Sequence, residues 1–367
     1  MIPALPGKFG VASSLLELVD TSRQDPYASS CQTRRLMLSA FYPAGLIESC
    51  DAVFSPYMPA NTAAVYDTEY SSFGIPNGTF DSLDLSLCAA NSSKKGVENT
   101  SFPIILFSPG LGNSRLLYNV MARSLASQGF VVITIDHPYD ASIVEFPDGS
   151  VVLAADITTD DQITQAVDFR RMDVSFVIDQ LHNPCIRRRL FHDVADIKYV
   201  DNIMMFGHSL GGATAAAAML RDRRIMGGIN LDGSLFGPVL DHGLHCPFAI
   251  FAHEGKNLTT DPSWEKMWLE LDSTRLELAV VGSQHGSFTD LLLLTKVLGL
   301  TDYLSEEVAS LIGTIDGERM LEILGAYMGA FFDFAAGRTE IPLITGSDTN
   351  FPEMEILEED IRGRCAS

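Results

Sequence analysis

Gly207, Ser209 and Gly211 form the pattern Gly-x-Ser-x-Gly, which is typical of a nucleophile elbow, the tight turn that presents a reactive serine. Small residues at both ends of the pattern let the backbone bend sharply, so the Ser209 hydroxyl can stand exposed above the edge of a sheet. The apolar run 203–206 before the turn predicts a buried strand, and the Ala- and Leu-rich segment 213–220 after it predicts a helix. The predicted chemistry is therefore nucleophilic attack by Ser209, on an elbow made of Gly207, His208 and Gly211.

A serine hydroxyl is a weak nucleophile at neutral pH, so it needs an imidazole to accept its proton and a carboxylate to orient that imidazole. His285 is the favoured base because it follows the last strand expected in this part of the chain, at 276–281. His253 follows the strand expected at 247–252 and is the alternative base. A solvent-exposed histidine without a catalytic role is the simpler interpretation of either residue.

The carboxylate partner has three candidates, each placed after an expected strand. Asp232 comes directly after the run 225–231, whereas Glu254 and Asp261 follow the next strand. Their positions alone do not separate the three, and most carboxylates in so acidic a chain lie on the surface.

Hydrolysis through a tetrahedral intermediate also needs two backbone N–H groups aimed at the oxyanion. The residue after the nucleophile, Leu210, is expected to supply the first. Leu111 is expected to supply the second, because Gly110 and Gly112 on either side let its amide turn inward. An ordinary structural turn is the alternative for this segment.

Strand patterns alternate with helical patterns along the chain, which is typical of an α/β fold with a mostly parallel sheet covered by helices on both faces. The runs 103–107 and 131–135 are nearly all apolar, as expected for central strands. The run 36–42 predicts an early antiparallel edge strand, and Thr159 and Gln162 predict a capping box that begins a helix. The remaining expected elements are strands at 203–206, 225–231, 247–252 and 276–281, with helices at 115–128 and 305–337.

This alternation, with a serine elbow followed by acid and base candidates, predicts an α/β-hydrolase fold. The helix that begins after Thr159 carries an apolar stripe that Arg170 interrupts once. We expect one domain over 1–367, with a surface insertion at about 44–101 and a helical C-terminal extension at about 303–367.

Composition narrows the classes of partner. The chain has 367 residues, 46% of them hydrophobic, which suffices for a large core. Its net charge of -22 argues against nucleic acid, because the surface would repel phosphates. No apolar run is long enough to span a bilayer. The apolar face made by Leu291–Leu294 and Val297 is typical of a core-facing helix, with peripheral contact to lipid as the alternative.

Cysteines and sequons favour an extracellular location, with a cytoplasmic one as the alternative. The six cysteines are compatible with three disulfides in any of 15 connectivities, or they are free buried thiols. Asn77, Asn91, Asn99 and Asn257 begin Asn-x-Ser/Thr sequons, three of them in the polar stretch 71–101. Residues 1–11 contain two prolines and no long apolar segment, so a signal peptide is expected to be absent from this chain.

Several of these segments resemble the platelet-activating factor acetylhydrolases of the plasma and intracellular type II group. The resemblance covers about 36–290, and the chain departs from it at Pro109, where animal members carry His, and in the stretch 71–101, which is closer to fungal secreted relatives. The matching segments are Phe107–Gly112, Leu125–Phe130, Gly207–Thr214, Leu231–Asp232, His285 and Phe288–Asp290.

The resemblance implies hydrolysis of a small-molecule or lipid ester with a short or oxidised acyl chain, without metal or cofactor. It selects Asp232 as the acid, leaves Glu254 as the runner-up, and supports Leu111 and Leu210 as oxyanion donors. Cutinase-like polyester hydrolases, lactonases and tailoring esterases share the fold and the three catalytic residues, so they remain alternatives. A non-catalytic binding protein of this fold is disfavoured by the intact nucleophile, base and acid candidates.

Overall fold

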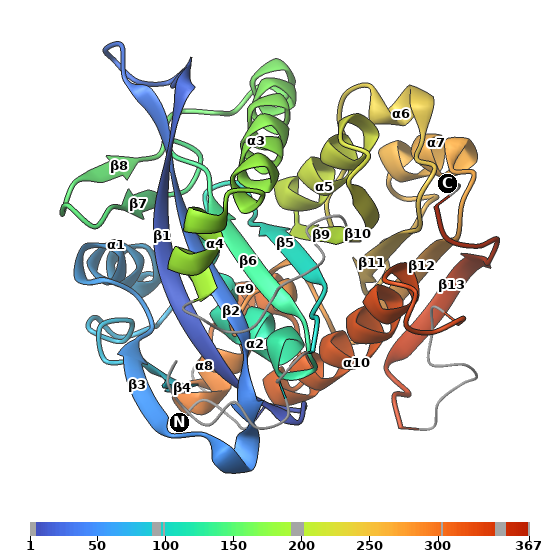
Figure 1. Cartoon of the computed structure of the whole chain (residues 1–367). Helices are drawn as coiled ribbons and strands as arrows, with labels where there is room; N and C mark the ends of the chain where they lie inside the picture. Colours follow the sequence, from blue (N-terminus) through green and yellow to red (C-terminus); the bar gives the residue numbers. More distant parts are fainter. Residues whose placement is uncertain are drawn as a thin grey trace.

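The computed structural model describes residues 5–89, 97, 100–191, 202–301, 304–341 and 350–365. Within them, nine strands form one sheet in the order β1-β2-β6-β5-β9-β10-β11-β12-β13, with β1 and β13 at its two edges (Figure 1). The strands are β1 (Phe9–Gln24), β2 (Thr33–Leu46), β5 (Ile104–Ser108), β6 (Val131–Asp136), β9 (Ile203–His208), β10 (Ile225–Leu231), β11 (Phe248–His253), β12 (Arg275–Val280) and β13 (Met354–Asp360).

The six strands from β6 to β12 run parallel to their neighbours, whereas β1, β2 and β13 pair antiparallel. The predicted mostly parallel sheet is therefore confirmed. In a parallel sheet the carboxyl ends of the strands all lie at the same end of the sheet. The loops that follow these carboxyl ends are where α/β folds place ligands.

Helices cover both faces of the sheet, as predicted. Successive residues of β5 point to opposite faces, so Ile105 and Phe107 join one hydrophobic core while Ile104 and Leu106 join the other. The first core includes side chains of α1 (Ala60–Ser71), α2 (Asn119–Ser127), α8 (Leu291–Val297), α9 (Glu306–Ile312) and α10 (Gly317–Ala335). The second includes side chains of α3 (Asp160–Leu181), α4 (Pro184–Phe191), α5 (Leu210–Arg221), α6 (Val239–His242) and α7 (Pro262–Glu270).

Two local predictions about these helices are confirmed. Thr159 and Gln162 form the capping box that begins α3. Leu291–Leu294 are buried in the first core, so this part of the apolar face is occupied by protein contacts. None of the described helices has the length and apolarity needed to span a membrane.

The expected edge strand at 36–42 is not an edge. It is the central part of β2, and β1 pairs with its outer edge from Phe9↔Leu46 to Asp20↔Arg34. Side chains from both faces of this segment are buried, with Leu38 in the second core and Phe41 in the first. The sequence prediction missed β1, in which buried and exposed residues alternate only in part.

The predicted helical C-terminal extension is wrong over Met354–Asp360. Helices α9 and α10 form, but β13 then pairs antiparallel with β12. Its acidic residues do not prevent strand formation, because most side chains of β13 are exposed to solvent at the edge of the sheet. A disulfide between Cys246 and Cys365 fastens the chain just after this strand.

The predicted surface insertion at 44–101 is wrong in part, because much of it is buried. It contains η1 (Ile47–Ser49), β3 (Ala52–Pro56), α1 and β4 (Asp84–Cys88), and β3 pairs with β4. Tyr57, Tyr66 and Phe80 lie in the first core. Asn77 is exposed, whereas Asn91 and Asn99 lie outside the described residues.

Two of the three allowed disulfides are formed. Cys50 bonds Cys88, and Cys246 bonds Cys365, whereas Cys31 and Cys185 are free and exposed. Neither set of alternatives in the sequence prediction, three bridges or all free buried thiols, describes this arrangement.

Candidate active site

The turn after β9 has the strained geometry of a nucleophile elbow. Ser209 has φ 54° and ψ -123°, a conformation that costs free energy for a residue with a side chain. A Cβ at Gly207 would lie 2.1 Å from the carbonyl carbon of Gly211, and one at Gly211 would lie 1.9 Å from the Ser108 oxygen. Both positions therefore require glycine, and α5 begins directly after the serine.

The serine is half-buried and lies beside the loop that follows β5. A Cβ built on Gly110 would lie 3.4 Å from the Ser209 Cβ, which places this loop against the elbow. The Ser209 hydroxyl makes no hydrogen bond to any residue in the described ranges, so transfer of its proton to a base stays a prediction. Such hydrogen bonds are often long in free enzymes and tighten when substrate binds.

Of the three candidate acids, the structure joins Asp232 to the predicted base. The His285 Nδ1 atom lies 2.5 Å from the Asp232 Oδ2 atom. Glu254 instead accepts a hydrogen bond from the Gly282 backbone N–H at 2.8 Å and is exposed. Asp261 caps α7 by accepting a hydrogen bond from the Ser263 N–H at 3.0 Å.

Asp232 also binds the alternative base. The His253 Nδ1 atom lies 2.8 Å from both carboxylate oxygens, so two imidazoles share one buried acid. The side chain of His285 is 44% exposed and that of His253 25%, so His285 is the more accessible of the two. From the sequence these two histidines are alternatives for one role, and no local pattern indicates that both contact Asp232.

The carboxylate stays ionised. Burial alone would raise the pKa of Asp232, but hydrogen bonds from His253 and His285 and the charge of Lys256 outweigh burial and lower that pKa well below its usual range. Lys256 Nζ lies 3.9 Å from Asp232 Oδ1 and donates to the Asp232 backbone oxygen at 2.9 Å. Asp232 itself has a positive φ of 61°, and this lysine bond fixes its carbonyl.

His208, known from the sequence only as part of the elbow, connects the base to the β5 loop. Burial and the nearby His285 lower the pKa of His208 to about 3, so its imidazole is neutral. Since the His285 backbone oxygen only accepts, His208 Nε2 donates to it at 3.0 Å, and His208 Nδ1 accepts from the Tyr118 hydroxyl at 2.8 Å. The same hydroxyl accepts the Gly110 N–H at 3.2 Å.

The two expected oxyanion donors have free backbone N–H groups. Neither Leu111 nor Leu210 donates its N–H to an acceptor within the described part of the chain. Leu210 is the first residue of α5, and the N–H groups of a first helical turn have no intrahelical partner. The elbow and the β5 loop therefore bring two available donors to the same end of the sheet as Ser209.

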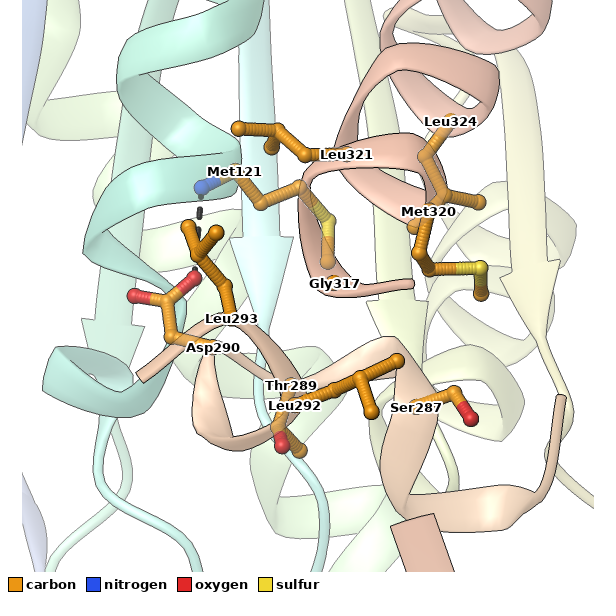
Figure 2. Close-up of a pocket in the computed structure, with 10 residues that line it drawn as sticks. All are labelled: Met121, Ser287, Thr289, Asp290, Leu292, Leu293, Gly317, Met320, Leu321 and Leu324. Atoms are coloured by element: carbon orange, nitrogen blue, oxygen red, sulfur yellow. Dashed lines mark hydrogen bonds between the residues drawn. The ribbon is translucent and has the colours of Figure 1, made fainter. Parts of the chain in front are cut away.

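The chain beyond His285 is anchored at Asp290 (Figure 2). This buried carboxylate accepts hydrogen bonds from the N–H groups of Val120 and Met121 at the start of α2 and from the Tyr57 hydroxyl. Burial raises the pKa of Asp290 to about 7 despite these bonds. A cavity of about 20 Å³ beside it, lined mostly by apolar side chains, is no larger than one or two water molecules and offers no room for an acyl chain.

Replacing His253 tests which histidine is the base. We expect His253→Phe to lower kcat about tenfold, because it removes one charge-assisted hydrogen bond to Asp232 but leaves the proton acceptor in place. The measurement is kcat for an activated ester such as p-nitrophenyl acetate, with the exposed His245→Phe as control. A loss for His253→Phe as large as that for His285→Phe would assign the base to His253 instead.

The family model and the curated relatives that match this chain carry names of the same kind of enzyme. The family model described as "Platelet-activating factor acetylhydrolase, isoform II" matches residues 79–148 and 189–336, more than half of the chain. A probable 1-alkyl-2-acetylglycerophosphocholine esterase of Arthroderma benhamiae is 30% identical over 98% of this chain and 94% of its own. The platelet-activating factor acetylhydrolase of Bos taurus is 26% identical over 68% of this chain and 62% of its own.

A solved structure is similar over nearly the whole chain. The ferulic acid esterase of Streptomyces cinnamoneus matches with a TM-score of 0.81 and 27% identity, covering 97% of this chain and 99% of its own. The relatives and the solved structure are thus all named as enzymes that hydrolyse esters.

Proposed function

Because the chain belongs to the platelet-activating factor acetylhydrolase family of isoform II and is an ester hydrolase, we propose that it removes short acyl chains, acetyl above all, from glycerophospholipids or similar esters. The observation that carries this proposal is the buried Asp232 bonded to His285, at the end of the sheet where the Ser209 elbow lies. The name of the Arthroderma benhamiae relative supports the acetyl ester as the substrate class.

The proposed reaction begins with attack by the Ser209 oxygen on the ester carbonyl. His285 holds its Nδ1 proton against Asp232, which leaves its Nε2 atom free to accept the serine proton. The ionised Asp232 stabilises the imidazolium that forms, and the Leu111 and Leu210 N–H groups stabilise the oxyanion. His285 then protonates the leaving alcohol.

Water completes the proposed cycle. His285, again neutral, takes a proton from water, which attacks the acyl group on Ser209. The second tetrahedral intermediate uses the same two amides, and its collapse releases the carboxylic acid and restores the Ser209 hydroxyl.

A panel of acyl chains tests the substrate class. We expect kcat/KM for p-nitrophenyl esters to fall at least about a hundredfold from acetyl to palmitoyl, because each methylene beyond a short acyl site costs binding in the transition state. We also expect 1-alkyl-2-acetylglycerophosphocholine to be hydrolysed faster than a phosphatidylcholine with two long chains.

Other results of the panel would assign the enzyme to a different substrate class. A preference for palmitoyl esters or a polyester would favour a cutinase-like enzyme, and highest turnover of a lactone would favour a lactonase. Methyl ferulate is included because the solved relative is named for that acid. Ser209→Ala is the matched control, since any hydrolysis that it retains is not due to the proposed site.

We also propose an extracellular or otherwise oxidising location. Two disulfides join residues far apart in the chain, Cys50 with Cys88 and Cys246 with Cys365. Disulfides persist in such compartments and are rare in the cytosol, which supports this part of the proposal.

A further inference from the structure

Arg170 is a buried arginine in the middle of α3, where the sequence pattern calls for an apolar residue. Its side chain is only 1% exposed and faces the loop that follows β5. Its Nη1 atom donates to the Pro109 oxygen at 2.5 Å, and its Nη2 atom donates to the Gly110 oxygen at 3.3 Å. One guanidinium thus holds two successive carbonyl groups of the loop.

These two bonds fix the direction of the Leu111 N–H. In a trans peptide the carbonyl oxygen and the N–H group point to opposite sides of the bond. Because the Gly110 oxygen points toward Arg170, the Leu111 N–H points away from α3. A Cβ built on Gly110 would lie 3.4 Å from the Ser209 Cβ, so the loop that carries this N–H packs against the nucleophile elbow.

Asp140 supports the loop at two points, through its carboxylate and through its backbone oxygen. Its carboxylate binds Arg170, with Nε to Oδ2 at 2.7 Å and a second contact from Nη2 to Oδ1. Its backbone oxygen accepts the Gly112 N–H at 3.0 Å, on the far side of Leu111. The Leu111 amide therefore lies between two anchored peptides that share Asp140 as their support.

A further buried chain of hydrogen bonds supports the start of the loop. Arg170 Nη1 lies 3.3 Å from the Ser108 hydroxyl, which contacts His137 Nε2 at 3.0 Å. His137 Nδ1 contacts Asp173 at 2.8 Å, and Arg34 binds the same carboxylate at 2.7 Å. A buried network with its members paired is rigid, so it resists rotation of the peptides that it holds.

We propose that Arg170 is a positioning residue for ester hydrolysis, which aims the Leu111 N–H at the oxyanion by holding the Pro109 and Gly110 carbonyls. This inference rests on the role proposed above for Leu111. The polar contacts of Arg170 are to Asp140 and to residues 108–110, so it touches none of the proposed reacting atoms. It acts through the loop, so losing it should weaken stabilisation of the transition state and leave binding of the ester nearly unchanged.

The test compares Arg170→Met with Arg171→Met. Methionine keeps much of the side-chain volume but donates no hydrogen bond. Arg171 is the neighbouring arginine on α3 and is bonded to the exposed Asp168, so its variant controls for loss of one positive charge from the same helix. We expect Arg170→Met to lower kcat about a hundredfold with KM within about threefold, and Arg171→Met to match the unsubstituted enzyme.

A thionoester measurement separates positioning from general damage to the fold. Sulfur accepts hydrogen bonds poorly, so an O-aryl thionoacetate gains less from the oxyanion donors than the matching acetate does. We expect the ratio of kcat/KM for acetate over thionoacetate to fall at least about tenfold in Arg170→Met, because the acetate alone loses a strong donor. Loss of folded enzyme would lower both rates equally and leave the ratio unchanged.

Arg170→Lys provides the second variant, since lysine keeps the charge opposite Asp140 and can reach one carbonyl. The decreases in kcat and in the acetate-to-thionoacetate ratio should both be smaller than in Arg170→Met. If Arg170→Met does not fold, the same two measurements on Arg170→Lys decide the question. An unchanged ratio in the folded variants would overturn the inference. The proposed function fails by a different result, which is retention of activity by Ser209→Ala.

Discussion

Ser209→Ala is expected to abolish ester hydrolysis, with kcat reduced roughly 10⁵- to 10⁶-fold, as in serine hydrolases that lose their nucleophile. Without the hydroxyl no acyl-enzyme forms, and only stabilisation of direct water attack remains. The strained elbow is retained because alanine also carries a Cβ, so the unfolding midpoint should stay close to that of the unsubstituted chain. The measurement is kcat for p-nitrophenyl acetate together with a thermal unfolding curve.

Ser234→Ala is the matched control, because Ser234 lies in the loop after Asp232 and bonds the Asp261 carboxylate at 2.6 Å. Its kcat should stay within about twofold, as is usual for an exposed side chain outside the reaction. Hydrolysis at an unchanged rate by Ser209→Ala would reject the elbow as the catalytic centre.

Asp232→Asn is expected to lower kcat about 10⁴-fold. The amide cannot stabilise an imidazolium by charge, and its NH₂ group favours the wrong tautomer of His285. The pKa of Asp232 is lowered by its histidine and lysine partners, so the carboxylate is ionised throughout the neutral range and the loss should be present at every pH from 6 to 9. The measurement is a pH profile of kcat for the same ester.

Glu254→Gln and Asp261→Asn are the controls for this acid. Glu254 contacts a backbone N–H and Asp261 caps a helix, so neither change should lower kcat more than about threefold. A 10⁴-fold loss in Glu254→Gln with an active Asp232→Asn would show that the acid has been misassigned.

Both predictions start from residues that the sequence alone identified. A glycine-flanked serine between an apolar strand and an Ala-rich helix is a local pattern, and the structure shows why both glycines are needed. Central strands such as 103–107 were predictable because burial on both faces leaves them almost wholly apolar. Asp232 could be separated from Glu254 only by the family resemblance, since the choice depends on which carboxylate reaches His285, and the strands that precede Asp232 and His285 are separated in the sheet by β11.

The missed features depend on contacts between distant segments. The edge strands β1 and β13 lack a strong apolar signal, because one or both of their faces are solvated. His253 and His208 gave no local sign of their partners, which follow other strands. Arg170 did give a sign, as a charged residue that interrupts the apolar stripe of α3, but its partners at 108–110 and Asp140 became visible only in the folded chain.

Labelling with a fluorophosphonate reports whether Ser209 is the nucleophile of this enzyme, because the probe bonds only to a serine that has been made nucleophilic. After reaction of the whole chain and peptide mapping by mass spectrometry, we expect one adduct per molecule, on Ser209, and none in Ser209→Ala. No adduct in the folded chain, or an adduct on a different serine that abolishes hydrolysis, would show that Ser209 is not the nucleophile.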